Sequence, residues 1–477
     1  MKSGLLHQRG LVKENVHTAE EDMLRQIDSD GIETVRFLFA DCHGTLRGKA
    51  LVAHAVSSAL ANGVAVPSSV MLKDTSSRTV FPVWEKDAGL GPGVMTGAGD
   101  MLLVPDASTF RRLPWSQHSA WVLCDTVQPD GTAITFAPRT VLNHALKRLH
   151  NHGMDLVIGL ELEFHIYNQI GNLFSHDGLG MPGVPLETAP LNQGYQLLSD
   201  TEYARVEPIL DELRRMAVAL DIPVRSTEVE FGPSQFEFTF DPAPARVQAD
   251  RMVLFRTMVK QICMNGGLHA TFMCKPKFDQ AAASGWHLHQ SLIDLKSEEN
   301  LFRSHDDALT PQANHWIAGL LEHAQESTLL TTPTLNGYSR YQSGQLAPDR
   351  IVWARDNKGA MLRVLMGKDD PASRVENRTP EPAANPYYAI AAQIYSGLSG
   401  LERELVPPEP VERPYDGNAK LLATTFGEAI EAFEKSNLYE VETPLLKSIF
   451  THIKRAELER YNSAPEDWEH KEYFQLF

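Results

Sequence analysis

The sequence predicts an α+β fold built around strands that carry carboxylates, and three observations support this. In Gly159–Phe164, glutamates alternate with large apolar side chains, so a strand would place Glu161 and Glu163 together on one face. Helical segments near 202–220 and 243–264 lie between strands of this kind, as in a mixed α+β domain. The alternation also recurs in three further segments, Phe236–Phe240, His287–His289 and Arg374–Arg378.

The amino-terminal part predicts a separate small, β-rich unit. Residues 1–30 resemble a helical arm, and Thr34–Phe39 followed by a turn at 41–44 predicts a strand leading into a hairpin. The turn residues Pro129-Asp130-Gly131 precede a helix predicted over 137–152, so we place a domain boundary near 132. This gives domains of 1–132 and 133–477. Other elements predicted are a helix near 52–62, strands at 101–104 and 121–124, and a helical assembly surface over 418–477.

Composition excludes several classes of partner. The 477 residues include 44 basic and 61 acidic side chains, and this net charge of −17 argues against nucleic acid or an anionic membrane as a partner. No stretch of 18 apolar residues and no secretory signal is found, so a cytoplasmic location is expected. The four cysteines lie far apart in apolar surroundings and predict buried thiols.

If the polar strands share one sheet, they form a cleft that suits divalent cations. At an effective dielectric constant of 20, two like charges about 4 Å apart repel by about 4 kcal/mol, so adjacent carboxylates need a cation unless they face open water. A solvated acidic edge strand is the alternative for any one segment. Oxygen-rich sites without thiolates favour Mg²⁺ or Mn²⁺ over zinc. The candidate ligands are Glu161, Glu163, Glu230, Glu237, His287 and Glu376.

A nucleotide, if bound, needs metals and arginines, because phosphate-cradling loops are lacking. Gly178–Gly183 matches G-x-G-x-x-G, but polar residues precede it and Pro182 interrupts it, so we interpret it as a surface loop. No G-x-x-x-x-G-K-[ST] occurs. Residues 336–378 carry eight basic and five acidic side chains, and guanidinium groups beside divalent cations suit a polyphosphate.

Taken together, these motifs resemble the glutamine synthetase superfamily over nearly the whole chain. The resemblance implies an amino-terminal β-grasp domain and a catalytic domain with a curved antiparallel sheet flanked by helices. It implies stacked hexameric rings, as in a dodecamer, with active sites between subunits. It also implies ATP-dependent phosphorylation of the glutamate γ-carboxylate, followed by attack of a nitrogen nucleophile. The matching segments are Glu161–Phe164, Glu230–Glu237, Phe272–Pro276, Ser284–Ser291, Asn336–Arg340 and Arg374–Arg378.

Roles carried over by position remain implications of this resemblance. One of two or three Mg²⁺ or Mn²⁺ ions would be held by Glu163, Glu230 and Glu237, and another by Glu161, His287 and Glu376. Arg340 and Arg378 match residues that hold glutamate, with Gly285 and His287 beside them. His289, Ser291 and Arg374 match the nucleotide side, and Arg363 with Lys358 matches the pair that stabilises the transferring phosphoryl group. Asp74 resembles an aspartate that a neighbouring subunit lends to the ammonium pocket.

Departures from the family pattern bear on the substrate. Leu346 stands where ammonia-using members place a flap glutamate, and leucine can neither hold ammonium nor accept its proton. An apolar residue there favours an organic amine, namely an alkylamine, polyamine or arylamine. Ala282-Ala283 replace a common Asn-Gly on the loop that contacts glutamate. Trp286 replaces the usual methionine and either fills the core or forms a wall of an enlarged amine pocket.

The preferred hypothesis is therefore a glutamate-amine ligase, and three alternatives stay open. The first is a true glutamine synthetase that uses ammonium. The second is a non-catalytic structural or regulatory member, against which the retention of all six candidate ligands argues. The third is a two-metal hydrolase with the same carboxylates, which would not consume ATP.

Overall fold

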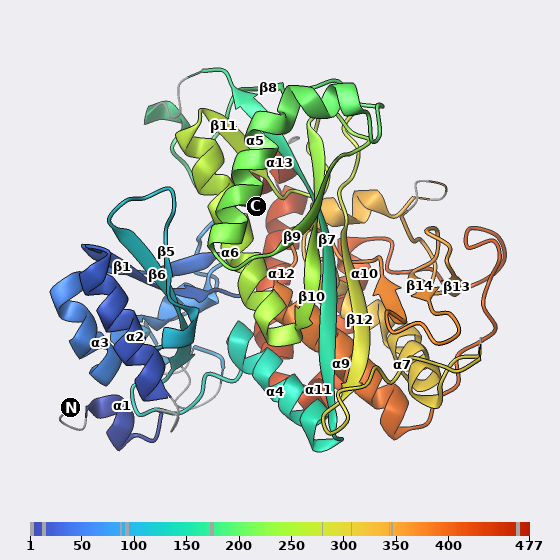
Figure 1. Cartoon of the computed structure of the whole chain (residues 1–477), viewed down its shortest axis with the longest axis horizontal. Helices are drawn as coiled ribbons and strands as arrows, with labels where there is room; N and C mark the ends of the chain where they lie inside the picture. The colour runs from blue at the N-terminus through green and yellow to red at the C-terminus, as the bar shows by residue number, and fades with distance from the viewer. Residues whose placement is uncertain are drawn as a thin grey trace.

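Two β-sheets, each with its own helices, make up the chain (Figure 1). This computed structural model describes residues 4–11, 16–85, 88–90, 95–171, 176–278, 280–306, 308–342, 344, 347–463 and 468–477. The predicted α+β class is confirmed.

The amino-terminal sheet has the order β2-β1-β6-β4-β3, with β5 paired to β6. The predicted hairpin is present, because β1 pairs antiparallel with β2 across the turn at 41–44, and β1 also runs parallel to β6. Helices α2 and α3 accompany this sheet (Figure 1). The elements are α1 (Leu5–Gln8), α2 (Val16–Ser29), β1 (Thr34–Ala40), β2 (Leu46–Val52), η1 (Ala53–Ala55), α3 (Val56–Asn62), β3 (Val64–Pro67), η2 (Ser68–Leu72), η3 (Thr96–Ala98), β4 (Asp100–Pro105), η4 (Ala107–Thr109), β5 (Arg111–Arg112) and β6 (Ser119–Val127).

The second sheet joins all four predicted polar strands in the order β13-β14-β15-β12-β7-β10-β9, with β8 and β11 paired to β7. Every pairing in it is antiparallel except β13 with β14. The long strand β7 runs through its centre (Figure 1). The strands are β7 (Met154–Gln169), β8 (Thr188–Pro190), β9 (Val224–Val229), β10 (Gln235–Pro244), β11 (Leu268–Thr271), β12 (Trp286–Asp294), β13 (Trp353–Arg355), β14 (Leu362–Leu365) and β15 (Arg374–Asn377).

The apolar face of this sheet packs against helices. Leu162 and Phe164 of β7 are fully buried, and Phe255 of α6 makes edge-to-face contact with Phe164 at a centroid distance of 6.1 Å. Trp286 pairs with Leu162 across β12 and β7 and is also fully buried, so it fills the core. Burial of one face leaves the carboxylates of the other face to form a cleft.

Three further helices lie where the sequence predicts them. Those predicted over 137–152, 202–220 and 243–264 correspond to α4 (Pro138–Asn151), α5 (Asp200–Ala219) and α6 (Ala245–Asn265). All four cysteines are free and buried, as expected. The others are η5 (His176–Gly178), α7 (Pro311–Glu322), α8 (Ala324–Thr331), η6 (Leu335–Arg340), α9 (Pro386–Glu402), α10 (Phe426–Glu434), α11 (Asn437–Glu442), α12 (Pro444–Ser463) and α13 (Trp468–Tyr473).

The Gly178–Gly183 segment is a surface loop, as predicted. Leu179 and Met181 in it are exposed. Strand β7 extends to Gln169, because β8 and β11 supply partners for its end. Among the described residues, no helix has the length and apolar character needed to span a bilayer.

Candidate active site

Strand register brings the predicted carboxylates into one row across three strands. Glu163 of β7 lies opposite Glu237 of β10, and Glu237 lies opposite Glu228 of β9. Because directly opposed residues of a sheet share a face, these three side chains line one side of the cleft together. Glu230 follows directly after the end of β9.

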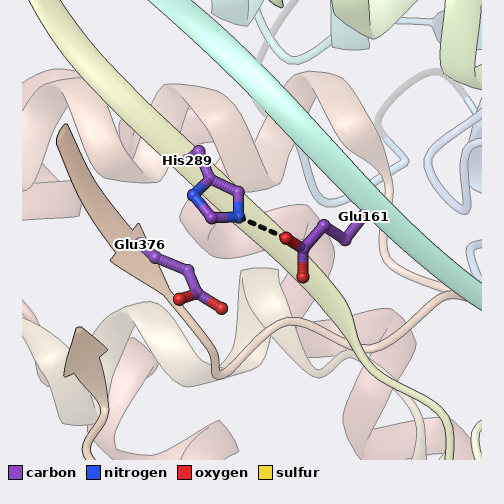
Figure 2. Close-up of side chains that lie close together, drawn as sticks. All are labelled: Glu161, His289 and Glu376. Carbon is purple, nitrogen blue, oxygen red and sulfur yellow. Dashed lines mark hydrogen bonds and ion pairs between the residues drawn. The ribbon is translucent and has the colours of Figure 1, made fainter. Parts of the chain in front are cut away.

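Histidines occupy the other side of the cleft. His287 of β12 lies opposite Glu161, while His289 lies opposite Glu376 of β15, and Glu376 lies opposite Arg363 of β14. Figure 2 shows Glu161, His289 and Glu376 converging from three neighbouring strands. The strand register therefore brings six strands, β7, β9, β10, β12, β14 and β15, to one site.

Glu161 accepts hydrogen bonds from both histidines. His287 Nδ1 lies 3.0 Å from one carboxylate oxygen. His289 Nε2 lies 2.9 Å from the other, as Figure 2 shows. Arg374 Nε donates to His289 Nδ1 at 3.1 Å, and Arg340 Nη2 lies 3.4 Å from His287 Nε2. An arginine behind each ring thus leaves the other ring nitrogen to donate toward Glu161.

Among the described residues, three groups of side chains place candidate ligand atoms within 4.8 Å of one another: Glu161 with His289 and Glu376, Glu161 with Glu237 and His287, and Glu228 with Glu230 and Glu237. All six predicted ligands lie in the same cleft, although Glu163 belongs to none of these groups. Sequence reasoning missed Glu228 and gave His289 only a nucleotide role. Glu228 stands two residues before Glu230, so strand alternation was the signal that could have found it.

The pKa values of the carboxylates in the cleft are shifted in opposite directions. Burial and neighbouring carboxylates raise the pKa of Glu163 to about 8 and that of Glu237 to about 10. Burial acts in the same direction on Glu161, but the hydrogen bonds from the two histidines outweigh it and hold the pKa of Glu161 well below its ordinary value. Closely spaced buried carboxylates beside histidine nitrogens form a donor set that fits Mg²⁺ or Mn²⁺.

Arginines surround the buried carboxylate of Glu376. Arg363 Nη1 donates to it at 3.1 Å, and Arg378 forms a second ion pair with it. Arg363 also donates to Asp356 at 2.6 Å and 2.9 Å through two of its nitrogens. Arg340 donates to the carbonyl oxygens of Arg378 and Thr379 at 2.8 Å and 3.0 Å. Arg340, Arg363 and Arg378 therefore lie close to Glu376 and His287 on the histidine side of the cleft.

The loop that carries Gly285 packs against Glu163, which belongs to the row of carboxylates on β7, β10 and β9. Glu163 N donates to Gly285 O at 3.1 Å, and Gln235 Nε2 donates to Glu163 Oε2 at 3.1 Å and to Ser284 Oγ at 2.9 Å. A Cβ atom on Gly285 would lie 2.6 Å from Arg340 Nη2 and 2.8 Å from His287 Nε2. Only glycine at position 285 leaves room for the side chains of Arg340 and His287. Gln235 is a further residue of this site that the sequence did not single out.

A cavity of about 500 Å³ opens beside the histidine side of the cleft. It is lined by three residues predicted for the nucleotide, His289, Ser291 and Arg374, together with Glu161. The hydroxyl of Ser291 donates to Ser373 O at 2.9 Å. Lys358 and Arg363, the other two predicted nucleotide contacts, are not among its described lining residues.

Lys358 and Asp74 lie apart from this cavity. Lys358 is exposed in the turn after β13, and its charge opposes the rise in the pKa of Glu230 that burial causes. Asp74 is buried, accepts hydrogen bonds from Ser76, and lies 3.4 Å from Arg460 of α12. Leu346 lies outside the described residues.

Comparison with known proteins identifies similar chains. The family model described as "Glutamine synthetase, catalytic domain" matches residues 135–473. Gamma-glutamylanilide synthase of Acinetobacter sp is 36% identical over 96% of each chain, and gamma-glutamylethanolamide synthetase GlnA4 of Streptomyces coelicolor is 29% identical over 95% of each. The solved structure "Apo GmaS without ligand" covers 94% of this chain and 98% of its own, with a TM-score of 0.78 and 27% identity. These matches confirm the predicted fold.

Proposed function

Because this chain belongs to the glutamine synthetase family, we propose that it is an ATP-dependent ligase that joins the γ-carboxylate of L-glutamate to an organic amine. The observation that carries this proposal is the convergence of carboxylates, histidines and arginines in the cleft of the second sheet. The products would be a γ-glutamylamide, ADP and phosphate. The names of the two relatives given above, an anilide synthase and an ethanolamide synthetase, support an amine over ammonium.

The carboxylate side and the histidine side of the cleft together suit two or three divalent ions. Glu163, Glu230 and Glu237 would hold one ion, with Glu228 beside them. Glu161, His287 and Glu376 would hold another. When bound, Mg²⁺ or Mn²⁺ screens the repulsion between the polyphosphate and the carboxylate that it phosphorylates.

The chain's own residues would position ATP and glutamate on either side of these ions. His289, Ser291 and Arg374 line the adjoining cavity, where the nucleotide would lie. Arg363 and Lys358 would stabilise the charge of the transferring phosphoryl group. Arg340 and Arg378, next to Gly285, would hold glutamate with its γ-carboxylate toward the ions.

Amide formation then needs a neutral amine nitrogen. The nitrogen attacks the acyl carbon of γ-glutamyl phosphate, a C–N bond forms, and the C–O bond to phosphate breaks. An arylamine is neutral at pH 7, whereas an alkylammonium must first lose a proton, for which we propose Asp74 of a neighbouring subunit as the acceptor. Contacts of Asp74 with α12 in its own subunit, rather than with the cleft carboxylates, agree with a role in the next active site of a hexameric ring or dodecamer.

A screen of nitrogen nucleophiles tests the proposal. Metal-dependent ADP release should be measured with glutamate and, in turn, ammonium, ethylamine, putrescine, ethanolamine and aniline. We expect turnover with at least one organic amine to exceed turnover with ammonium. Turnover with ammonium alone would identify a glutamine synthetase instead, and no ADP release with any nucleophile would favour a non-catalytic member.

Substitution of Leu346, at the predicted flap position, tests the choice between ammonium and an organic amine directly. Leu346→Glu adds a carboxylate that can hold ammonium and accept its proton, so kcat/KM for ammonium relative to the best amine should rise about tenfold. Leu346→Gln is the matched control, because it has similar size but cannot take up the proton at neutral pH. An unchanged ratio in Leu346→Glu would remove the argument from this residue.

A further inference from the structure

The short turn η6 is bonded at both of its ends to segments of the proposed glutamate site. Arg340, its last residue, donates to the carbonyl oxygens of Arg378 and Thr379 at 2.8 Å and 3.0 Å. Near its start, the buried Asn336 accepts from Lys275 N at 2.7 Å and donates to Lys275 O at 2.9 Å. The turn therefore fixes the distance between these two segments.

The segment at Lys275 also begins the loop that leads to Gly285. Ser284 N donates to Cys274 O at 2.7 Å, and Cys274 Sγ donates to Ser284 O at 3.2 Å. These two bonds hold the ends of the loop together. Because Cys274 and Lys275 are neighbours in the chain, η6 is connected to Gly285 as well as to Arg340.

A buried carboxylate fastens the start of η6. Glu381 Oε1 accepts from Thr334 N at 2.8 Å, and Glu381 Oε2 accepts from Thr334 Oγ1 at 2.8 Å. Thr334 caps the turn, since its hydroxyl oxygen accepts from Gly337 N at 3.2 Å. A Cβ atom on Gly337 would lie 2.7 Å from Glu381 Oε2, so the carboxylate also lies against the middle of the turn.

Glu381 is fully buried. Burial raises the pKa of this carboxyl to about 8, although the hydrogen bonds from Thr334 act in the opposite direction. A buried acid is costly unless its oxygens accept hydrogen bonds, and here both oxygens accept from the capping residue of one turn. Its position therefore depends on Thr334, and that of Thr334 on it.

Residues 378–381 thus contact both ends of η6, through Glu381 at the start and through carbonyl oxygens at the end. Neither η6 nor residues 378–381 contribute a described lining residue to the cavity in which the nucleotide would lie. Release of η6 from Glu381 should therefore displace Arg340 and Gly285 while leaving the nucleotide contacts in place.

We propose that Glu381 is a positioning residue for glutamate. Through Thr334 it fixes η6, and through η6 it holds Arg340 and the Gly285 loop in the geometry that binds the substrate. Glu381 itself does not contact glutamate, because its carboxylate is buried against the turn. This inference rests on the proposed function, since it takes Arg340 as a glutamate contact.

Two pairs of matched variants test this role. Glu381→Met keeps the approximate size of the side chain but removes both acceptors, whereas Glu381→Gln keeps an acceptor for Thr334 N and can donate to the hydroxyl oxygen. Thr334→Val removes the hydroxyl at nearly constant shape, whereas Thr334→Ser retains it.

Equilibrium dialysis of the full-length protein against labelled L-glutamate, with Mg²⁺ and saturating ADP, measures the effect. We expect Glu381→Met and Thr334→Val to weaken glutamate binding about tenfold, and Glu381→Gln and Thr334→Ser to weaken it by less than about threefold. Separate calorimetric titration with ADP and Mg²⁺ should give a Kd within about twofold of the wild type in all four variants. A residue that only stabilised the fold would not separate glutamate from ADP in this way.

Three results would overturn the inference: unchanged glutamate binding in Glu381→Met and Thr334→Val, equal weakening of glutamate and ADP binding, or equal weakening by Glu381→Gln and Glu381→Met. If Glu381→Met fails to fold, Thr334→Val and Thr334→Ser provide the same comparison.

Arg340→Gln separates this inference from the proposed function. Weak glutamate binding in Arg340→Gln, together with normal binding in Glu381→Met and Thr334→Val, would remove the role of Glu381 alone. Normal binding in Arg340→Gln would remove the proposed role of Arg340 and this inference with it. Failure of the amine screen would leave glutamate binding and its dependence on Glu381 intact.

Discussion

Replacing Glu237 with glutamine is expected to reduce metal-dependent ATP turnover by a factor on the order of 10²–10³ while leaving the protein folded. Glu237 lies between Glu163 and Glu228 in the strand register and is only 8% exposed. Glutamine keeps the shape of the side chain but removes the negative charge that a divalent ion needs. The measurement is ADP release in parallel with Mn²⁺ binding to the protein without nucleotide.

The stability of metal-free Glu237→Gln should also depend on pH differently from that of the wild type. Burial and nearby carboxylates raise the pKa of Glu237 to about 10, so between its ordinary pKa and about 10 the folded protein holds a proton that the unfolded chain releases. Unfolding of the metal-free protein is therefore favoured as pH rises through this range. We expect thermal unfolding in chelator to show that metal-free Glu237→Gln is more stable than the wild type at pH 8, with a smaller difference at pH 5.

Addition of Mn²⁺ should favour the wild type over Glu237→Gln in stability. Mn²⁺ should raise the unfolding temperature of the wild type more than that of Glu237→Gln, because a ligand that binds only the folded state stabilises it. Glu207→Gln, on the exposed face of α5, should match the wild type in every assay. Turnover of Glu237→Gln within threefold of the wild type would show that Glu237 is not a metal ligand.

Gly285→Ala is expected to lower kcat/KM for glutamate by about a hundredfold with little loss of stability. The added Cβ would lie 2.6 Å from Arg340 Nη2 and 2.8 Å from His287 Nε2, so both side chains must move from their present places. One is a proposed glutamate contact and the other a proposed metal ligand. Steady-state kinetics with varied glutamate, together with thermal unfolding, measure the two effects.

Gly367→Ala provides the control for this substitution. Its Cβ would meet only Asp370 Cβ, at the ordinary contact distance of 3.9 Å. We expect wild-type kinetics from it. Equal kinetics in Gly285→Ala and Gly367→Ala would mean that the loop before β12 does not set the geometry of the glutamate site.

Much of the second sheet could be predicted because its strands alternate strictly. In Gly159–Phe164 and Phe236–Phe240, a period of two separates apolar from carboxylate side chains, and both segments lie in strands of one sheet. Helix α4 was equally visible, since Pro138 opens it after a turn. Local patterns of this kind need no knowledge of distant residues.

Pairing partners could not be predicted in the same way. Glu228 looked like an ordinary acidic residue, and only its position opposite Glu237 places it in the cleft. His289 carries no local sign that it meets Glu161 and Glu376, which come from two different strands.

By itself, the sequence determined which side chains share a face within each strand, the helices between strands, and the charge and motifs that indicate a metal-dependent ligase. Only the tertiary structure decided which strands are neighbours, in which register, and which polar atoms remain without partners. The reason is physical: the face of a side chain follows from the backbone period of its own segment, whereas its neighbours depend on hydrogen bonds and packing between segments up to hundreds of residues apart.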